Sequence, residues 1–310
     1  MTGESAPNIS VIVCTRNRVR SLEKCLDSLL SLNYPKSEFE IVVVDNNSDD
    51  ETRVILQSKY SNVVRYIFES RIGIAYARNT GVKHARGSII AFIDDDCIPD
   101  KNWLKELIKG FKSSEIIGVG GPTRPLNEKI PKSKTVHSVL GTFDRGTREQ
   151  YVSFVGSGNC AFKREALNLT LFDVNMKVSE DVGFCLILTR LGYKLLYVPS
   201  AITYTLIPPN RLGIKPVIQR GFSDGESYLY LNLQTKSWPK CLIFLIIHII
   251  HYSIRFFKKR NYRNFYRLLI GVSAIVAIPN VIRLRKLNLR GRDSNKSINI
   301  NKQNFCAGYM

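Results

Sequence analysis

The stretch SIIAFIDDDCIPDKNWL, residues 88–104, decides both the fold and the chemistry expected of this chain. Its apolar run, residues 89–93, leads directly into Asp94, Asp95 and Asp96, and a helix is predicted to begin near Lys101. Adjacent carboxylates repel one another, so a triplet at the end of a buried strand needs a compensating cation. A divalent metal ion held by oxygen ligands would supply one.

The first 200 residues alternate between two kinds of segment. Short apolar runs rich in β-branched residues predict strands at 9–13, 41–44, 63–68 and 89–93, and helices are predicted at 22–30, 50–60, 74–86 and 102–112. Ser21 is the predicted N-cap of the first helix. This alternation is typical of α/β proteins with a mostly parallel sheet, and the uninterrupted apolar runs predict strands buried on both faces.

Polar side chains follow three of the predicted strands. Thr15, Arg16 and Asn17 come after the first strand, Asp45 after the second, and the Asp triplet after the fourth. Ligands of such sheets bind beyond the carboxyl ends of the strands, so these side chains are predicted to line one binding site. The polar residues at 46–50 are explained more simply as turn formers and helix caps.

The segment ESRIGIAYARNTGVKHARG, residues 69–87, offers Arg71 and Arg78 as contacts for a phosphate or a nucleotide. Mg²⁺ in proteins is commonly held by one or two carboxylates together with phosphates of the substrate. Arginines near a carboxylate triplet therefore indicate a phosphate-bearing substrate.

Four segments, in their order along the chain, resemble the family-2 glycosyltransferases. They are VIVCTRNRVRSLEKCLDSLLSLNYPKSEFEIVVVDNNSDD, RIGIAYARNTGVKHARGSIIAFIDDDCIPDKNWL, GSGNCAFKREAL and SEDVGFCLILTRLGYKLLYVPSA, and the resemblance covers roughly residues 8–230. It implies the GT-A fold, which is Rossmann-like, and sugar transfer with inversion. It also implies a nucleotide-diphosphate sugar donor, for which a UDP-linked sugar is the first candidate, and a divalent metal, Mn²⁺ or Mg²⁺, at a DxD-type motif.

The same resemblance implies roles for individual residues. On the donor side it implies nucleotide contacts from Thr15, Arg16, Asp45 and Arg78. Asp95 and Asp96 are implied to meet the ribose and the metal, with Asp96 as the metal ligand and Asp94 shaping the turn. Asn17 and Arg71 are added to the donor side from their places in the sequence. On the acceptor side it implies Gly156, Ser157, Gly158, Asn159 and Glu180, with Asp181 as the base that removes the proton of the acceptor hydroxyl. Without the resemblance, SEDVGF would be a simple helix start, capped by Ser179 and with acids that complement the helix dipole.

One departure from the family pattern concerns the metal. Many relatives carry a histidine downstream of the Glu-Asp motif that can bind the metal, and Thr205 and Leu206 stand at that place here. Either water or diphosphate oxygens complete the coordination, or the activity is altered. The segment RGFSDGES, residues 220–227, still matches a family pattern.

The last third of the chain is basic and apolar. Residues 238–292 hold 12 Lys and Arg and no Asp or Glu, and the net charge of the whole chain is +19. The apolar runs 241–254 and 268–282 are both shorter than the roughly 20 residues of a typical spanning helix. Apolar runs flanked by cations predict association with an anionic membrane surface. A soluble helical extension and a re-entrant or spanning hairpin are the alternatives.

The predicted domains are a catalytic domain at 1–235, a basic helical extension at 236–292 and a disordered tail at 293–310. The polar N-terminus predicts no signal peptide, and seven dispersed cysteines without a CxxC pair predict free thiols in a reducing compartment. These features predict a protein at the cytoplasmic face of a membrane.

Other functions are compatible with parts of the pattern. A nucleotidyltransferase would use similar carboxylates, although the GSGN and Glu-Asp segments favour glycosyl transfer. A non-catalytic member of the family is a further alternative, because the histidine of many relatives is missing. Nucleic-acid binding is not expected, because the basic residues lie among apolar runs and match no nucleic-acid motif. The expected acceptor is a saccharide or a lipid-linked saccharide, in the synthesis of a surface polysaccharide or a lipid-linked saccharide.

Overall fold

The computed structural model describes residues 7–126, 142–205, 207, 214–235, 238–258 and 262–282. These residues form two compact units: 7–126, 142–174 and 181–205 make up the first, and 175–180, 207, 214–235, 238–258 and 262–282 make up the second. Residues 214–235 thus group with the helices that follow them, and the functional boundary at 235–236 stays a prediction. The predicted tail at 293–310 lies outside the described residues.

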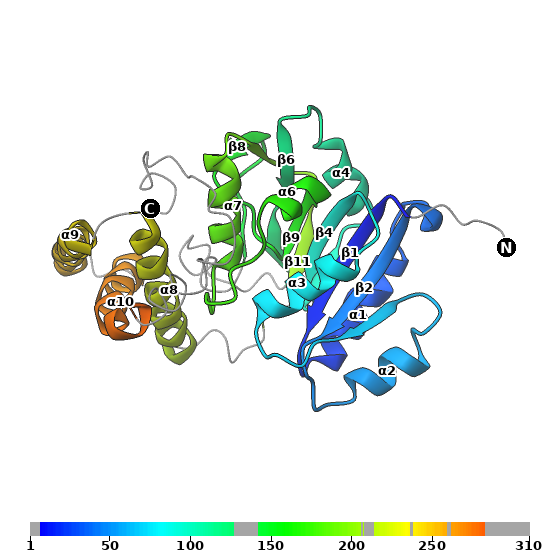
Figure 1. Ribbon diagram of the computed structural model, residues 1–310, viewed down its shortest axis with the longest axis horizontal. Helices are drawn as coiled ribbons and strands as arrows, with labels where there is room; N and C mark the ends of the chain where they lie inside the picture. The colour runs from blue at the N-terminus through cyan, green and yellow to red at the C-terminus, as the bar shows by residue number, and fades with distance from the viewer. Residues whose placement is uncertain are drawn as a thin grey trace, which may run out of the picture. The chain divides into compact units, whose positions relative to one another are not determined.

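An eight-stranded sheet forms the centre of the first unit (Figure 1). Its strand order is β3-β2-β1-β4-β9-β6-β10-β8. In chain order the strands are β1 (Ile9–Thr15), β2 (Phe39–Asp45), β3 (Arg65–Phe68), β4 (Ile89–Asp94), β6 (Ile116–Gly120), β8 (Gln150–Val152), β9 (Asn159–Lys163) and β10 (Lys194–Tyr197). All except β8 and β9 run in the same direction, which confirms the predicted mostly parallel sheet.

Helices cover both faces of this sheet. On one face lie α1 (Val19–Leu30), α2 (Thr52–Ser58) and α4 (Trp103–Lys109), and on the other lie α3 (Ile74–His84), α6 (Arg164–Leu169) and α7 (Glu180–Arg190). The side chains of β1 alternate between the two cores, with Val11 and Val13 in the first and Ile12 and Cys14 in the second. Burial on both faces is the reason that the strands are uninterrupted apolar runs.

The register of the sheet brings the ends of three strands to one edge. Thr15 of β1 pairs with Asp45 of β2, and Cys14 of β1 pairs with Asp94 of β4. Since these strands are adjacent and parallel, the polar residues after them lie at the same carboxyl edge. The predicted meeting of these segments is thereby confirmed.

Helix α1 begins at Val19, so the prediction of Ser21 as its N-cap is wrong. Arg18 occupies the cap position, and its side chain makes no capping hydrogen bond. Asp50, from the loop after β2, accepts a hydrogen bond from the Val19 amide at 3.1 Å instead. The cap comes from a residue 31 positions away, so the local sequence does not show it.

A small sheet follows the Asp triplet directly, in the order β5-β11-β7. Its strands are β5 (Cys97–Pro99), β7 (Thr123–Pro125) and β11 (Thr203–Thr205). The helix predicted near Lys101 therefore begins later, at Trp103. It ends at Lys109, before Gly110, where a Cβ would lie 2.6 Å from Val119.

The described part of the second unit contains α8 (Ile214–Thr235), α9 (Trp238–Lys258) and α10 (Tyr262–Val276), of which α8 was not predicted. Two glycines of the RGFSDGES segment let α8 pack closely against α10. A Cβ on Gly225 would lie 1.9 Å from Ser273 Oγ and 2.6 Å from the Ile270 carbonyl oxygen, and a Cβ on Gly221 would lie 2.5 Å from Leu269. This segment therefore has a packing role.

Two further predictions concern the cysteines and the apolar runs, and the structure bears on both only within the described residues. The cysteines of the described residues, six in number, are all buried and free, which agrees with the predicted free thiols. Within the described residues, no helix combines the length and the apolar character that crossing a membrane requires.

Candidate active site

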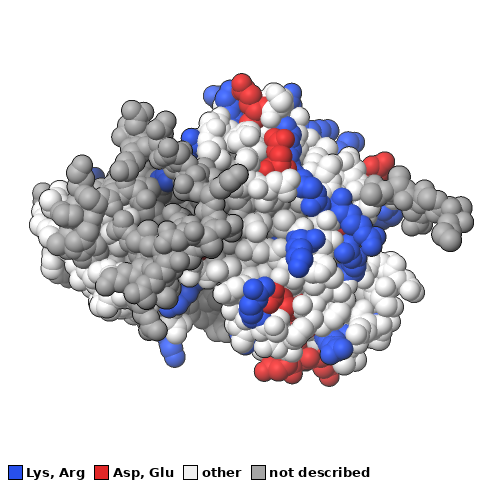
Figure 2. All heavy atoms as spheres, in the orientation of Figure 1, with Lys and Arg blue, Asp and Glu red and all other residues white. Residues whose placement is uncertain are grey.

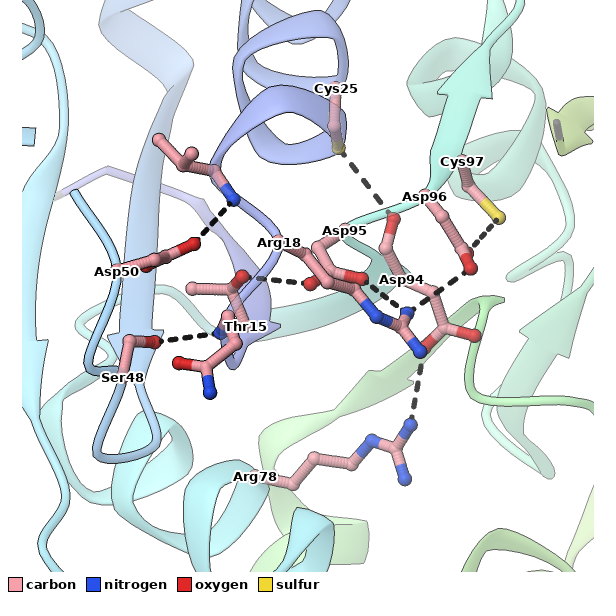
Figure 3. Close-up of polar contacts among 12 residues, drawn as sticks. Thr15, Arg18, Cys25, Ser48, Asp50, Arg78, Asp94, Asp95, Asp96 and Cys97 are labelled. Carbon is pink, nitrogen blue, oxygen red and sulfur yellow. Dashed lines mark hydrogen bonds and ion pairs between the residues drawn. The ribbon is translucent and has the colours of Figure 1, made fainter. Parts of the chain in front are cut away.

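The Asp triplet lies at the end of β4, with two arginines around it (Figure 3). Arg18 Nη1 donates to Asp95 Oδ1 at 3.0 Å and to Asp96 Oδ2 at 3.2 Å. Arg78 Nη2 donates to Asp94 Oδ1 at 3.2 Å. The compensating positive charge that the sequence requires thus comes from two guanidinium groups in this structure.

Asp95 is the most deeply buried carboxylate of the triplet, with 3% of the residue exposed. Thr15 Oγ1 donates to Asp95 Oδ2 at 2.7 Å. Burial raises the pKa of Asp95 to about 6, although Arg18 and the Thr15 hydrogen bond act in the opposite direction. Groups with such perturbed pKa values are frequent at functional sites.

Asp94 connects the triplet with the acceptor-side loop, residues 156–159. A Cβ on Gly158 would lie 2.6 Å from Asp94 Oδ2, so a residue with a side chain would collide with the carboxylate. Partial burial raises the pKa of Asp94, and the charges of its neighbour Asp96 and of Asp181 add to this effect, while Arg78 opposes it. The predicted donor side and acceptor side are therefore in direct contact.

Asp181 lies at the start of α7, and Ser157 of the acceptor-side loop holds its carboxylate. The amide and Oγ of Ser157 donate to Asp181 Oδ2 at 3.0 and 3.1 Å, and the Val182 amide donates to Oδ1 at 2.8 Å. A carboxylate oxygen accepts about two hydrogen bonds, so the bonds from described residues leave capacity on Oδ1. The side chain of Glu180, in contrast, is buried, with 4% of the residue exposed.

The buried side chain of Asn159 anchors the acceptor-side loop to the core through hydrogen bonds. Its residue is 2% exposed, and its Oδ1 accepts a hydrogen bond from Trp103 Nε1 at 2.7 Å. Its Nδ2 donates to the carbonyl oxygens of Pro122 and Ala201 at 2.8 and 2.7 Å. Asn159 therefore positions the loop, and a direct contact of its side chain with an acceptor stays a prediction. Gly156, at the other end of the loop, borders open space.

The loops after β1 and β2 are joined to each other. Asn17 has a φ of 55°, and its amide donates to Ser48 Oγ at 3.0 Å. Asp45 is buried and accepts hydrogen bonds from the Tyr66 hydroxyl at 3.1 Å and from the Ser48 amide at 2.9 Å. Arg16 is exposed on the first of these loops. The loops form a fixed rim, and the nucleotide contacts expected from Asn17, Asp45 and Arg16 stay predictions.

Arg71 is fixed by a two-point ion pair with Glu69. Its Nε and Nη2 donate to Glu69 Oε1 and Oε2 at 2.9 and 2.8 Å, and this pair is the main reason that the pKa of Glu69 falls to about 2. Asn46 Nδ2 donates to the Arg71 carbonyl oxygen at 2.7 Å, and its Oδ1 accepts from the Gly73 amide at 2.8 Å. Asn46 thus shapes the segment that carries Arg71.

The residues that could together hold a metal ion, among those that the structure describes, are Asp94, Asp96 and Cys97. Their ligand atoms all lie within 4.8 Å of one another. Carboxylate oxygens are the ligands that Mg²⁺ and Mn²⁺ prefer. Burial raises the pKa of the Cys97 thiol well above its usual range, which disfavours a thiolate ligand. The donor set therefore fits a hard divalent cation.

Thr205, at the place of the family histidine, lies on β11 directly opposite Cys97 of β5. This position therefore adjoins the triplet, although a threonine stands there and is 4% exposed. Leu206, the second residue at this place, lies outside the described residues.

Three residues of this arrangement were not assigned to it from the sequence: Arg18, Asn46 and Glu69. Arg18 could have been suspected from the sequence, because it belongs to the same TRNR segment as Arg16. Which of the two arginines faces the triplet depends on where α1 begins. Asn46 depends on contacts with distant residues, whereas Glu69 pairs with Arg71 only two positions away, and neither residue type by itself indicates this role.

Comparison with known proteins shows which family the chain resembles. The model of the family described as glycosyl transferase family 2 matches residues 10–170. The chain is 37% identical over 180 residues to glycosyltransferase AglE of Haloferax volcanii, covering 57% of this chain and 55% of that protein. It is 27% identical over 237 residues to a dolichyl N-acetyl-alpha-D-glucosaminyl phosphate 3-beta-D-2,3-diacetamido-2,3-dideoxy-beta-D-glucuronosyltransferase of Methanococcus voltae, covering 71% and 72%. The chain thus spans little more than half the length of the first relative.

Solved structures share the fold. The mannosyltransferase PcManGT from Pyrobaculum calidifontis, in complex with GDP-Man and Mn²⁺, has a TM-score of 0.57 at 19% identity, covering 95% of this chain and 77% of that one. GalNAc-T7 with UDP, GalNAc and Mn²⁺ has a TM-score of 0.52 at 19% identity, covering 66% and 44%. At these identities the likeness concerns the fold alone, a large central sheet with flanking helices.

Proposed function

The chain belongs to glycosyl transferase family 2 and is a glycosyltransferase with the GT-A fold, and from this premise we propose an inverting transfer from a nucleotide-diphosphate sugar to an acceptor hydroxyl. The GDP-Man and UDP in the related structures support a nucleotide-linked donor. The dolichyl phosphate in the name of the Methanococcus relative, and the poly-beta-1,6-N-acetyl-D-glucosamine synthase of Staphylococcus aureus, support a lipid-linked or saccharide acceptor.

Asp96, with Asp94 beside it, is the proposed holder of a divalent cation. The Mn²⁺ in both related structures supports this assignment. When bound, such a cation neutralises negative charge on the leaving diphosphate. Thr15 and Arg78 keep the neighbouring carboxylates of the triplet in place by their hydrogen bonds to Asp95 and Asp94.

Asp181 is the proposed catalytic base. The acceptor oxygen forms a bond to the anomeric carbon while the bond from that carbon to the diphosphate oxygen breaks, and the hydroxyl proton moves to Asp181 Oδ1. Ser157 holds Oδ2 with two hydrogen bonds, so the orientation of the carboxylate is set before the acceptor binds.

The observation that carries this proposal is the contact of one short loop with both carboxylates. Gly158 packs against Asp94, and Ser157, the residue before it, binds Asp181. A donor at the triplet and a base at Asp181 would therefore keep a fixed separation, as a displacement from the face opposite the diphosphate requires.

Calorimetric titration of nucleotide sugars, with and without Mn²⁺, tests the roles of the two acids. Asp96→Asn should remove the part of donor affinity that depends on Mn²⁺, whereas Asp181→Asn should keep it. An Asp96→Asn variant with unchanged metal-dependent affinity would rule out Asp96 as the metal ligand.

The proposed membrane partner rests on helix α9, whose described side chains include a buried side and, opposite it, an exposed apolar side. Its buried side chains include Leu245, His248 and Tyr252. On the opposite side, apolar side chains at helical spacing are between 45% and 74% exposed: Ile243, Ile246, Ile247, Ile250, Ile254 and Phe257. A helix of this kind requires apolar surroundings on both sides.

The positive charge of residues 238–292 favours an anionic membrane surface as the partner of the exposed side of α9. Residues 238–292 carry no acid, so a second copy of the same segment would repel it, whereas anionic lipids attract it. The first unit, in contrast, shows acidic as well as basic side chains on the face in view (Figure 2). We therefore assign catalysis to residues 1–235 and contact with the cytoplasmic face of a membrane to residues 236–292.

Sedimentation with phosphatidylcholine vesicles, with and without phosphatidylglycerol, tests the partner. The chain should bind only the anionic vesicles, and binding should weaken in high salt. Ile247→Glu should reduce binding, and Val54→Glu, a matched control at an equally exposed position of α2, should not. Equal binding of both variants would contradict the assignment, and a concentration-dependent dimer disrupted by Ile247→Glu would replace the membrane by a second copy.

A further inference from the structure

Arg18 reaches two carboxylates of the triplet with one nitrogen atom. Its Nη1 lies 3.0 Å from Asp95 Oδ1 and 3.2 Å from Asp96 Oδ2, so the guanidinium sits between the two acids (Figure 3). The other oxygen of Asp96, Oδ1, lies 3.9 Å from Cys97 Sγ. The carboxylate assigned to the metal therefore already has a cation against it.

A divalent ion and Arg18 would compete for Asp96. Both are positive, and two cations on one carboxylate repel each other strongly in a partly buried site. Arginine cannot relieve this repulsion by losing its proton, because its guanidinium stays charged at any physiological pH. Binding of the ion therefore requires either movement of the Arg18 side chain or an additional negative charge.

The Arg18 side chain is free to leave the triplet, whereas the Arg78 side chain is held in place. The Arg18 side chain is 43% exposed and makes no capping hydrogen bond to α1, because Asp50 supplies that cap. Its departure would therefore leave the helix start intact. The Arg78 side chain is 6% exposed and lies over the ring of Phe172 at 5.7 Å, so it is held in place.

We propose that Arg18 is a displaceable counter-ion, which holds Asp95 and Asp96 in the absence of donor and shifts to the diphosphate oxygens when metal and nucleotide bind together. This inference rests on the proposed donor site. Arginine suits the exchange, because its planar group matches the geometry of both carboxylates and phosphates. The nucleoside diphosphate then draws Arg18 away from Asp96, where Arg18 competes with the metal. The metal and the nucleotide therefore each strengthen the binding of the other.

The test is Mn²⁺ binding, measured from the electron paramagnetic resonance signal of free Mn²⁺, alone and with UDP or GDP. Arg18→Gln should bind Mn²⁺ without nucleotide more tightly than the unaltered chain, by about 5- to 150-fold, the usual range for coupled ligands. In the unaltered chain, UDP or GDP should increase the affinity for Mn²⁺. In Arg18→Gln this increase should be smaller by a similar factor. Arg18→Lys keeps the charge and should therefore bind Mn²⁺ without nucleotide as weakly as the unaltered chain does.

Arg20→Gln is the matched control, because it removes the same charge from an exposed position two residues away, in the first turn of α1. It should leave Mn²⁺ binding unchanged, and thermal unfolding should confirm that all variants are folded. Unchanged or weaker Mn²⁺ binding by Arg18→Gln would overturn the inference, as would an Arg18→Lys variant that behaves like Arg18→Gln.

The result also distinguishes this inference from the proposed function. If the unaltered chain and Arg18→Gln both fail to bind Mn²⁺ even with nucleotide, the metal site itself is refuted and the inference with it. If the unaltered chain binds Mn²⁺ and nucleotide together and Arg18→Gln does the same with undiminished coupling, only the role of Arg18 is refuted.

Discussion

Replacing Asp95 by Asn should stabilise the metal-free protein near neutral pH. Asp95 is 3% exposed, and burial is the main cause that raises its pKa from 3.8 to about 6. Each pKa unit corresponds to about 1.4 kcal/mol, so keeping this carboxylate ionised costs the folded state roughly 3 kcal/mol at pH 7.5. Asn keeps an oxygen that can accept the Thr15 hydrogen bond and removes the charge.

The stability gained by Asp95→Asn should depend on pH in a defined direction. A carboxyl group whose pKa is raised on folding stabilises the fold fully below its unfolded pKa, and this contribution is lost as the pH rises through the folded pKa. The gain from Asp95→Asn should therefore approach roughly 3 kcal/mol at pH 7.5 and should be much smaller at pH 4.5.

Urea unfolding in the presence of EDTA, at both pH values, measures the effect. Asp49→Asn, at an exposed carboxylate of the loop after β2, is the control and should change the free energy of unfolding by less than about 0.5 kcal/mol. A loss of stability in Asp95→Asn at pH 7.5, or a gain of the same size at both pH values, would refute the reasoning.

Further predictions address the base, the Arg71 support and the helix packing. Asp181→Asn should lower turnover by roughly 10²–10⁴-fold with donor affinity kept, and Glu180→Gln should do less; the reverse order would move the base elsewhere. Glu69→Gln should lower the free energy of unfolding above pH 4.5, because the pKa of Glu69 is lowered from 4.5 to about 2, and this loss should shrink as the pH falls towards 2, followed by urea unfolding. Gly225→Ala should cost about 1–3 kcal/mol in thermal unfolding, since its Cβ would meet a backbone oxygen of α10 at 2.6 Å. Gly221→Ala, against a leucine side chain that can shift, should cost less.

The central sheet and its functional edge were predictable because both depend on short-range patterns. Buried parallel strands must be apolar on both faces, and runs such as 9–13 and 89–93 have that pattern. In a parallel sheet the residues after each strand share one edge, so Thr15, Asp45 and Asp94 could be brought together without coordinates.

The missed features depend on contacts between distant residues. Asp50, and not Ser21, caps α1, and this shifts the helix start so that Arg18 faces the triplet. Asn46 appears in the sequence as a turn former, yet it binds the backbone of the segment that carries Arg71.

Helix α8 was missed for a similar reason. Its glycines interrupt the apolar periodicity that predicts a helix, but the structure uses them for close packing against α10. Such residues gain their meaning only when the partner helix is known.

Release of nucleoside diphosphate from a panel of nucleotide sugars, with Mn²⁺ and no acceptor, tests the central claim most directly, because water can take the place of the acceptor. At least one donor should be hydrolysed, the release should stop when the metal is removed, and Asp96→Asn should abolish it. No release from any donor with Mn²⁺ present, or formation of pyrophosphate from a nucleoside triphosphate and a sugar phosphate instead, would contradict a metal-dependent glycosyl transfer.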